Sequence, residues 1–153
     1  MNKKQKSLTN KGFSLVELII VIAIMAVLVG VLAPQFIKYV EQSRRSTDIQ
    51  NAENIKTAVL ADIADGTITG SATLQEFTTL TKDGTGAITS FGSTTITTAP
   101  TVQGNLINNG GHFFVTYNAT NGTCQVYPCN NTDAKYDLTT ATTADSYKTA
   151  PAY

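Results

Sequence analysis

One carboxylate stands at the edge of a long apolar segment. Glu17 directly precedes residues 18–37, which include no charged side chain. A carboxylate at the border of membrane hydrocarbon costs about 2.5 kcal/mol or more unless a partner neutralises it. One interpretation is that the Glu17 carboxylate merely reaches the membrane–water interface and has no function. We instead treat Glu17 as a candidate functional residue that pairs with a positive charge.

The apolar segment is long enough to cross a membrane. A helix rises about 1.5 Å per residue, so residues 18–37 would cover about 30 Å, the thickness of the hydrocarbon layer. A secretory signal peptide would have a shorter apolar region followed by a small-x-small cleavage site, which residues 38–50 do not contain. Lysines before the segment place the N-terminus in the cytoplasm by the positive-inside rule.

Residues 11–17, which read KGFSLVE, resemble the class III signal of type IV pilins. That family has a basic leader that ends in Gly, then a Phe, and a Glu at the fifth position after the Gly. The resemblance is close over residues 11–34 and weaker up to about residue 64. It implies that a prepilin peptidase cuts between Gly12 and Phe13 and methylates the new amino group of Phe13.

A cut after Gly12 would leave a charged amine on Phe13, within one helical turn of Glu17. Inside one subunit the Glu17 carboxylate favours the positive N-terminus of its helix. In a bundle of parallel, staggered helices it could instead meet the Phe13 amine of the next subunit, which would pair two costly charges. The resemblance implies that this glutamate recruits subunits into a growing filament.

A weak point is expected inside the apolar helix. Pro34 removes one backbone hydrogen bond and clashes with the preceding turn, and Gly30 adds backbone freedom. A simple proline kink is one interpretation, since such kinks are common in membrane spans. The resemblance to pilins implies another, in which the segment melts locally in the filament.

From residue 38 the helix is predicted to be amphipathic. Apolar residues recur at steps of mostly three or four, with charged residues between them, which predicts one stripe that packs on a domain. The apolar positions are Val40, Ile49, Ala52, Ile55, Val59 and Ile63, and the charged ones are Glu41, Arg44, Arg45, Asp48, Glu53, Lys56 and Asp62. Asp65 and Gly66 are expected to end the helix.

The remaining residues are predicted to form a small head with an α+β fold. A capping-box pattern predicts a short helix over residues 73–82. Segments rich in β-branched and aromatic residues predict four strands, over residues 87–91, 94–98, 112–117 and 123–127, with a hairpin loop at 118–122. We expect a small antiparallel sheet packed against the amphipathic half of the long N-terminal helix, and a tail held by Tyr136, Leu138, Tyr147 and Tyr153.

The chain thus divides into four expected segments. They are a cleaved leader (1–12), a transmembrane and filament-core helix (13–37), the amphipathic half of that helix (38–65) and the globular head (66–153). The whole chain has eleven basic and eleven acidic residues, but four of the lysines lie in the leader. Removing the leader therefore turns a balanced precursor into an acidic product.

Cys124 and Cys129 leave two alternatives open. A disulfide requires Cα atoms within about 7 Å, whereas an extended run from residue 124 to 127 carries the chain away at about 3.3 Å per residue. A turn at Pro128 would have to recover that distance. Many pilins close a C-terminal loop with a disulfide, so the resemblance favours the bond, and the alternative is two free thiols.

The head lacks the side chains of an enzyme. Residues 66–153 hold one histidine, His112, with five acids and three lysines, and show no catalytic-triad spacing, metal-ligand spacing or phosphate loop. Asp133 and Asp137 could share a calcium ion, but hydrated loop acids are the simpler interpretation, and we expect no metal or other cofactor. The acidic head has no basic stripe, so no nucleic-acid partner is expected.

We therefore expect a structural subunit of a type IV pilus, the major pilin, that polymerises through its N-terminal helix for adhesion, surface motility or biofilm formation. The alternative is a pseudopilin of type II secretion, or a minor or competence pilin. The resemblance implies as partners further copies of the chain, prepilin peptidase, an inner-membrane platform protein and cytoplasmic ATPases. It also implies a single-pass membrane protein that becomes part of a cell-surface pilus.

Overall fold

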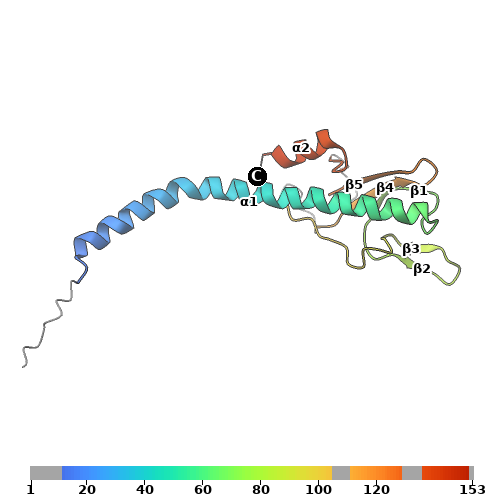
Figure 1. The fold of residues 1–153 in the computed structure, drawn as a ribbon, viewed down its shortest axis with the longest axis horizontal. Coiled ribbons are helices and arrows are strands. Elements are labelled where there is room, and N and C mark those ends of the chain that lie inside the picture. The colour runs from blue at the N-terminus through green and yellow to red at the C-terminus, as the bar shows by residue number, and fades with distance from the viewer. Residues whose placement is uncertain (1–11, 105–110, 129–135, 152–153) are drawn as a thin grey trace, which may run out of the picture. The chain divides into compact units, whose positions relative to one another are not determined.

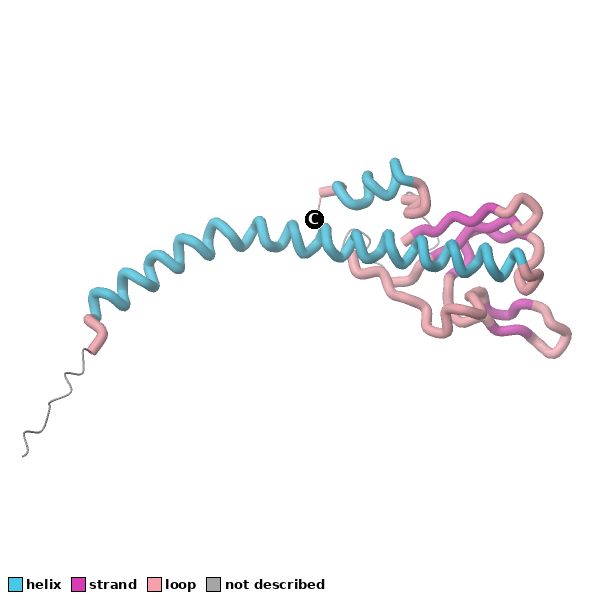
Figure 2. Tube along the Cα trace, in the orientation of Figure 1, coloured by secondary structure: helices cyan, strands magenta, loops and turns pink. Residues whose placement is uncertain are grey.

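The computed structural model describes residues 12–104, 111–128 and 136–151 (Figures 1 and 2). Its elements are α1 (Leu15–Ala64), β1 (Ser71–Glu76), β2 (Thr81–Lys82), β3 (Ile88–Ser90), β4 (Phe114–Asn118), β5 (Thr123–Tyr127) and α2 (Ala141–Thr149). The chain forms two compact units, residues 1–37 and residues 38–153. Each unit is described by itself.

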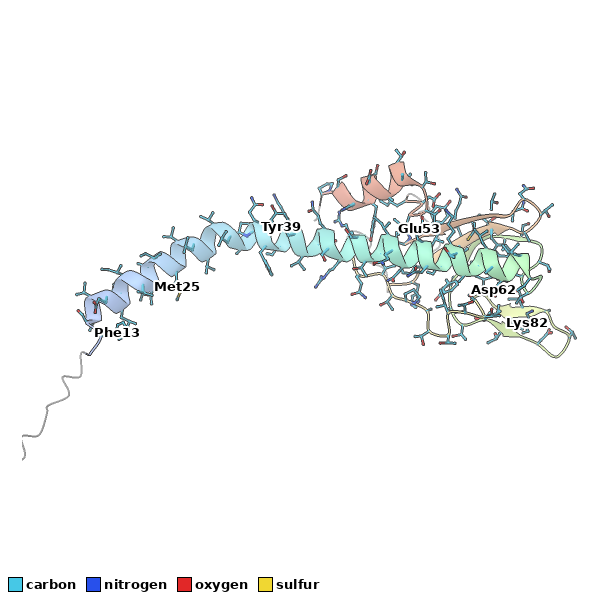
Figure 3. All side chains as sticks on the ribbon, viewed as in Figure 1. Phe13, Met25, Tyr39, Glu53, Asp62 and Lys82 are labelled. Atoms are coloured by element: carbon cyan, nitrogen blue, oxygen red, sulfur yellow. The ribbon has the colours of Figure 1, made fainter. Side chains whose placement is uncertain are left out.

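The described part of the first unit is the apolar beginning of α1. Every residue from 12 to 37 is exposed, including Phe13 at 91% and Met25 at 55% of its surface (Figure 3). Among the described residues, α1 is the one helix long and apolar enough to cross a membrane, with a mean hydropathy of 3.1 over its most apolar window. Apolar side chains exposed in such numbers require lipid or other helices to cover them.

In the second unit, α1 buries a stripe whose members are spaced by three or four residues. The stripe consists of Glu41, Arg45, Asp48, Ala52, Ile55, Val59 and Asp62. Its apolar members lie in the middle and are fully buried, which confirms the predicted packing face. The expectation that all charged residues lie outside the stripe is wrong, because four of them occupy its two ends.

The helix ends where the sequence predicts. Ala64 is its last residue, and Gly66 has a φ of 80°, a left-handed conformation that suits glycine. The Ile68 amide then donates to the Asp62 carbonyl at 2.9 Å, which turns the chain back toward the helix. Ile68 itself is fully buried.

The main sheet has three antiparallel strands in the order β1-β4-β5, and a separate antiparallel pair joins β2 and β3 (Figure 2). β4 and β5 pair without interruption from Phe114 opposite Tyr127 to Asn118 opposite Thr123. Both strands and the turn between them agree with the sequence prediction, and β3 falls inside its predicted range. The long helix with a small antiparallel sheet confirms the predicted α+β fold.

Three predicted details of the head are wrong. Residues 73–82 form β1 and β2 instead of a helix, residues 94–98 form a loop instead of a strand, and the expected sheet of about four strands is divided into sheets of three and two. The capping-box pattern is outweighed by long-range pairing, because β1 pairs with the edge of β4. Leu74 interrupts this pairing with a φ of 49°, which no helix accommodates.

Three aromatic rings form part of the hydrophobic core of the head. The rings of Phe91 and Tyr117 stack with centroids 4.9 Å apart, and Phe77 meets Phe91 edge-on at 6.3 Å. All three side chains are buried. The rings thereby join three segments that are apart in the sequence, namely the residues after β1, the residues after β3, and β4.

Asp62 holds the loop that replaces the predicted strand. Its carboxylate accepts a hydrogen bond from the Ser93 hydroxyl at 2.5 Å and one from the Thr94 amide at 3.0 Å, and the Thr94 hydroxyl also donates to it. Asp62 is 1% exposed. A buried carboxylate requires such donors, so the loop takes the path that supplies them instead of an extended strand.

Asp48 holds the C-terminal end of the loop that follows β3. Its two oxygens accept the amides of Gln103 at 2.7 Å and Gly104 at 2.8 Å, and Oδ2 also accepts the Tyr147 hydroxyl at 2.7 Å. Burial raises the pKa of Asp48, and the three hydrogen bonds oppose that shift. A Cβ on Gly104 would lie 2.5 Å from the Tyr147 hydroxyl, so this close approach requires glycine.

Arg45 fastens α2, an element that the sequence did not predict, to α1. Its Nε donates to Glu41 at 2.8 Å, and its Nη1 donates to the carbonyls of Tyr147 at 3.1 Å and Ala150 at 2.5 Å. Tyr147 and Leu138 are buried and Tyr136 is half-buried, as expected for residues that hold the tail, while Tyr153 lies outside the described residues. Buried polar groups thus secure the C-terminal part of the head.

We expect Arg45→Met to destabilise the head strongly. It would remove the buried guanidinium that donates to Glu41 and to two carbonyls of the C-terminal region, a loss of about 3 kcal/mol or more in the free energy of unfolding. Arg44→Met is the matched control, because Arg44 is the adjacent arginine and is exposed. Urea unfolding of the full chain in detergent measures both, and equal effects would contradict a role for the buried guanidinium.

Candidate functional site at the start of the apolar helix

The residues of the predicted processing site lie just before α1. Gly12 and Phe13 precede the helix in an irregular, exposed conformation, and a Cβ on Gly12 would meet no residue within 4 Å other than its two chain neighbours. An exposed backbone outside regular structure is what a peptidase needs at its cleavage site. The four leader lysines, Lys3, Lys4, Lys6 and Lys11, lie outside the described residues.

Glu17 forms a capping box with Ser14 at the helix N-terminus. The Ser14 amide donates to Glu17 Oε2 at 2.8 Å, and the Ser14 hydroxyl accepts the Val16 amide at 3.3 Å. Each contact satisfies a backbone amide that has no partner inside the helix. The S-x-x-E spacing that signals this box is visible in the sequence, but Ser14 was not recognised as a functional residue.

The capping box places the carboxylate beside the predicted cleavage site. Ser14, whose amide Glu17 binds, is joined directly to Phe13, so the carboxylate is held one residue away from the amine that cleavage would create. Only Oε2 has a hydrogen-bond partner among the described residues, and Oε1 remains open to a cation. This arrangement can accept a positive group without giving up the helix cap.

Gly30 and Pro34 lie inside α1, which is continuous through both residues. Pro34 has no amide to donate to the carbonyl four residues earlier, and that residue is Gly30. A Cβ at Gly30 would point into open space, apart from the backbone of the helix itself. Local melting at this point in a filament stays a prediction.

Asp137 serves the fold of the head. Its carboxylate accepts the amide and hydroxyl of Thr139 at 2.9 and 2.6 Å, the Thr140 hydroxyl at 2.7 Å and the Gln125 amide group at 3.2 Å. Burial acts to raise the pKa of Asp137, but these hydrogen bonds together lower it. Asp133, the other residue of the suggested calcium pair, lies outside the described residues.

Cys124 is a buried residue of β5 and has no disulfide partner among the described residues. Burial raises the pKa of its thiol to about 12, so the thiol is protonated and poorly nucleophilic at neutral pH. Cys129 lies outside the described residues, and the pairing of the two cysteines stays a prediction. Over the described ranges, no three His, Cys, Asp or Glu side chains gather into a group that could hold a metal ion.

Comparison with known sequences agrees with this geometry. The prokaryotic N-terminal methylation motif matches residues 8–33, a range that contains the Gly12–Phe13 junction, the capping box and most of the apolar run. The N-terminal segment of the chain therefore carries a prokaryotic methylation motif. This motif and the apolar helix, which is long enough to cross a membrane, support anchoring in a membrane.

Curated relatives match 37% to 40% of the chain. Two type IV major fimbrial proteins FimA from Dichelobacter nodosus are 36% and 38% identical to the chain over 56 residues, which is 37% of the chain and 36% of each relative. Prepilin peptidase-dependent protein A from Clostridium perfringens is 37% identical over 62 residues, 40% of the chain and 44% of the relative. The chain therefore spans less than half the length of these relatives. No solved structure is significantly similar to it.

We expect cleavage to depend on the small size of Gly12. In cells with a prepilin peptidase, intact-mass analysis should show a wild-type protein that begins at Phe13 and carries one additional methyl group. Gly12→Val should accumulate with its leader attached, because the added branched side chain restricts the backbone at the cut and fills the space beside it. Ser14→Ala, the matched control on the other side of Phe13, should be cleaved, and normal cleavage of Gly12→Val would contradict the proposed processing site.

Proposed function

We propose that the chain is the major structural subunit of a type IV pilus. The observation that carries the proposal is an exposed apolar helix with a single carboxylate in its first turn, directly after a predicted processing site. The relatives named as type IV major fimbrial proteins support it, since they are 36% and 38% identical to the chain over 56 residues. In this role the head is structural and performs no catalysis.

The assembly step is charge pairing between subunits. Cleavage creates an amine on Phe13, and Glu17 Oε1 of a neighbouring subunit is free to receive it while Oε2 keeps the helix cap. Phe13 and Glu17 are four positions apart, so pairing between them would shift adjacent helices along their axis by about 6 Å, at about 1.5 Å per residue. Two charges that are costly alone in apolar surroundings thereby neutralise each other and set the register of the filament.

The partners are those that this route requires. Prepilin peptidase would process the membrane-anchored precursor, and an inner-membrane platform protein with cytoplasmic ATPases would drive the addition of subunits. The resulting homopolymer would serve adhesion, twitching motility or biofilm formation. A pseudopilin of type II secretion with a C-terminal calcium loop is less well supported, because the Asp137 carboxylate already accepts several hydrogen bonds within the head.

The test of assembly is Glu17→Ala. We expect a subunit that is cleaved and inserted in the membrane but yields at least tenfold fewer sheared fibres, because the neighbouring amine loses its counter-charge. Glu17→Gln is the matched control for the helix cap, since its amide oxygen can still accept the Ser14 amide but carries no charge. Assembly by Glu17→Gln at the wild-type level would show that capping, not charge pairing, is what the filament needs.

The copy number distinguishes a major pilin from a minor or competence pilin. Quantitative mass spectrometry of sheared surface fibres should find this chain as the dominant protein. A minor subunit would appear at a small fraction of another pilin. A chain absent from fibres but present in the membrane would contradict the pilus proposal itself.

A further inference from the structure

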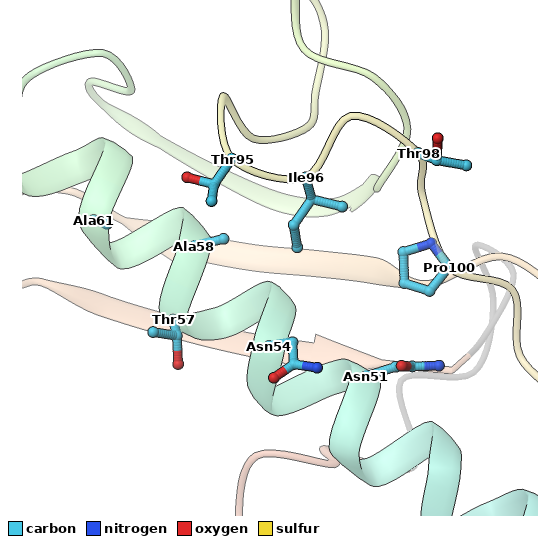
Figure 4. A pocket seen from close by; sticks show the side chains of 9 residues that line it. All are labelled: Asn51, Asn54, Thr57, Ala58, Ala61, Thr95, Ile96, Thr98 and Pro100. Carbon is cyan, nitrogen blue, oxygen red and sulfur yellow. The ribbon is translucent and has the colours of Figure 1, made fainter.

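A shallow groove of about 550 Å³ lies on the second unit, between α1 and the loop after β3 (Figure 4). Asn54, Thr57 and Ala61 of α1 contribute to one wall, and Ile96 and Pro100 of the loop to the other. Asn54, Thr57 and Ala61 are all exposed. The path of the loop is fixed by the Asp62 and Asp48 carboxylates, one on each side of the groove-lining stretch, so the groove has a rigid wall.

The groove contains no charge. None of its lining residues is acidic or basic, and the loop belongs to a stretch, residues 84–132, without any Asp, Glu, Lys or Arg. Exposed faces of helices normally carry charges, as α1 does at Glu53 and Lys56, which lie close to each other at 3.9 Å. Uncharged amide, hydroxyl and aliphatic groups lose water at far lower cost than ions do, which suits a surface that becomes covered.

We propose that a second copy of this chain covers the groove in the filament. The groove has no cation to bind phosphate of nucleic acids or anionic lipids and no aromatic ring on which a sugar could stack. The same chain presents a surface of matching character, the uncharged and largely exposed turn 119–122 between β4 and β5. A contact between two different surfaces of identical subunits is the type that builds an open helical polymer.

This inference rests on the proposed pilin function and adds a contact between heads. The Phe13–Glu17 pair would act in the apolar helices, whereas the groove would act between folded heads. Since the head contact contains no ion pair, it should resist salt, which screens contacts between exposed charges. The two contacts can therefore be disrupted separately.

Photo-crosslinking in the full-length chain tests the occupant. Benzoylphenylalanine at position 54, in cells that make fibres, should give a crosslinked homodimer whose second site maps to turn 119–122. The same probe in the Glu17→Ala background should give no dimer, because those subunits stay unassembled in the membrane. Fibres that carry the probe without a homodimer crosslink, or with a crosslink to lipid, sugar or another protein, would overturn the inference.

An isosteric charge provides an independent test. Asn54→Asp adds one negative charge to the groove, and we expect at least tenfold fewer fibres with unchanged cleavage and unfolding temperature. Gln75→Glu makes the same amide-to-acid change at an exposed position of β1 and should leave the fibre yield unchanged. Thr57→Asp replaces Asn54→Asp if the latter lowers the unfolding temperature.

The outcomes separate this inference from the proposed function. Fibres at the wild-type level from the groove variants would refute the head contact and leave the pilin function intact. A wild-type strain whose fibres lack this chain would refute the pilin function and the head contact together.

Discussion

The head depends on the satisfaction of charges that α1 buries. Arg45, Asp48 and Asp62 lie in the buried stripe of the helix, and each binds groups that are distant in sequence. A buried ion without partners costs several kcal/mol, so only conformations that bring the required donors and acceptors to these side chains are stable. The loop after β3 and the helix α2 also contact the core, through Ile96, Val102 and Tyr147, and these polar contacts hold both elements to α1. Specificity here comes from buried charges, while the aromatic and aliphatic core supplies most of the hydrophobic stabilisation.

The first unit presents the opposite arrangement. Its apolar residues are exposed, and the group that needs a partner from outside is the one carboxylate of Glu17. Lipid can cover the apolar side chains before assembly, and other helices of the same kind can cover them afterwards, at little difference in hydrophobic free energy. What distinguishes the two environments is whether they offer a counter-charge. Under the proposed function, this single acid would therefore control the transfer of a subunit from membrane to filament.

The sequence predicted those parts of the fold that local patterns determine. The β4–β5 hairpin has a run of β-branched and aromatic residues on each side of a turn rich in Asn and Gly, and the end of α1 has a glycine in the left-handed conformation. Residues 73–82 were misassigned because a short helical pattern cannot compete with pairing to β4, which only the folded chain reveals. The buried polar stripe was missed because Arg45 and Asp48 look like surface residues until their distant partners are known. At the candidate site, the motif identified Glu17, but its capping of Ser14 needed the geometry of the helix end.

Under the proposed function, the placement of the acids would allow an acidic product to pack closely with itself. Without its leader the chain has more acidic than basic residues, and equal charges on adjacent subunits would repel one another. Four of the eleven acids, Glu41, Asp48, Asp62 and Asp137, are buried within the head and hydrogen-bonded there. Their burial removes part of this charge from the surface, and the stretch of residues 84–132 adds none. The charges that specify the fold of each head are thereby kept away from the surfaces at which heads can meet.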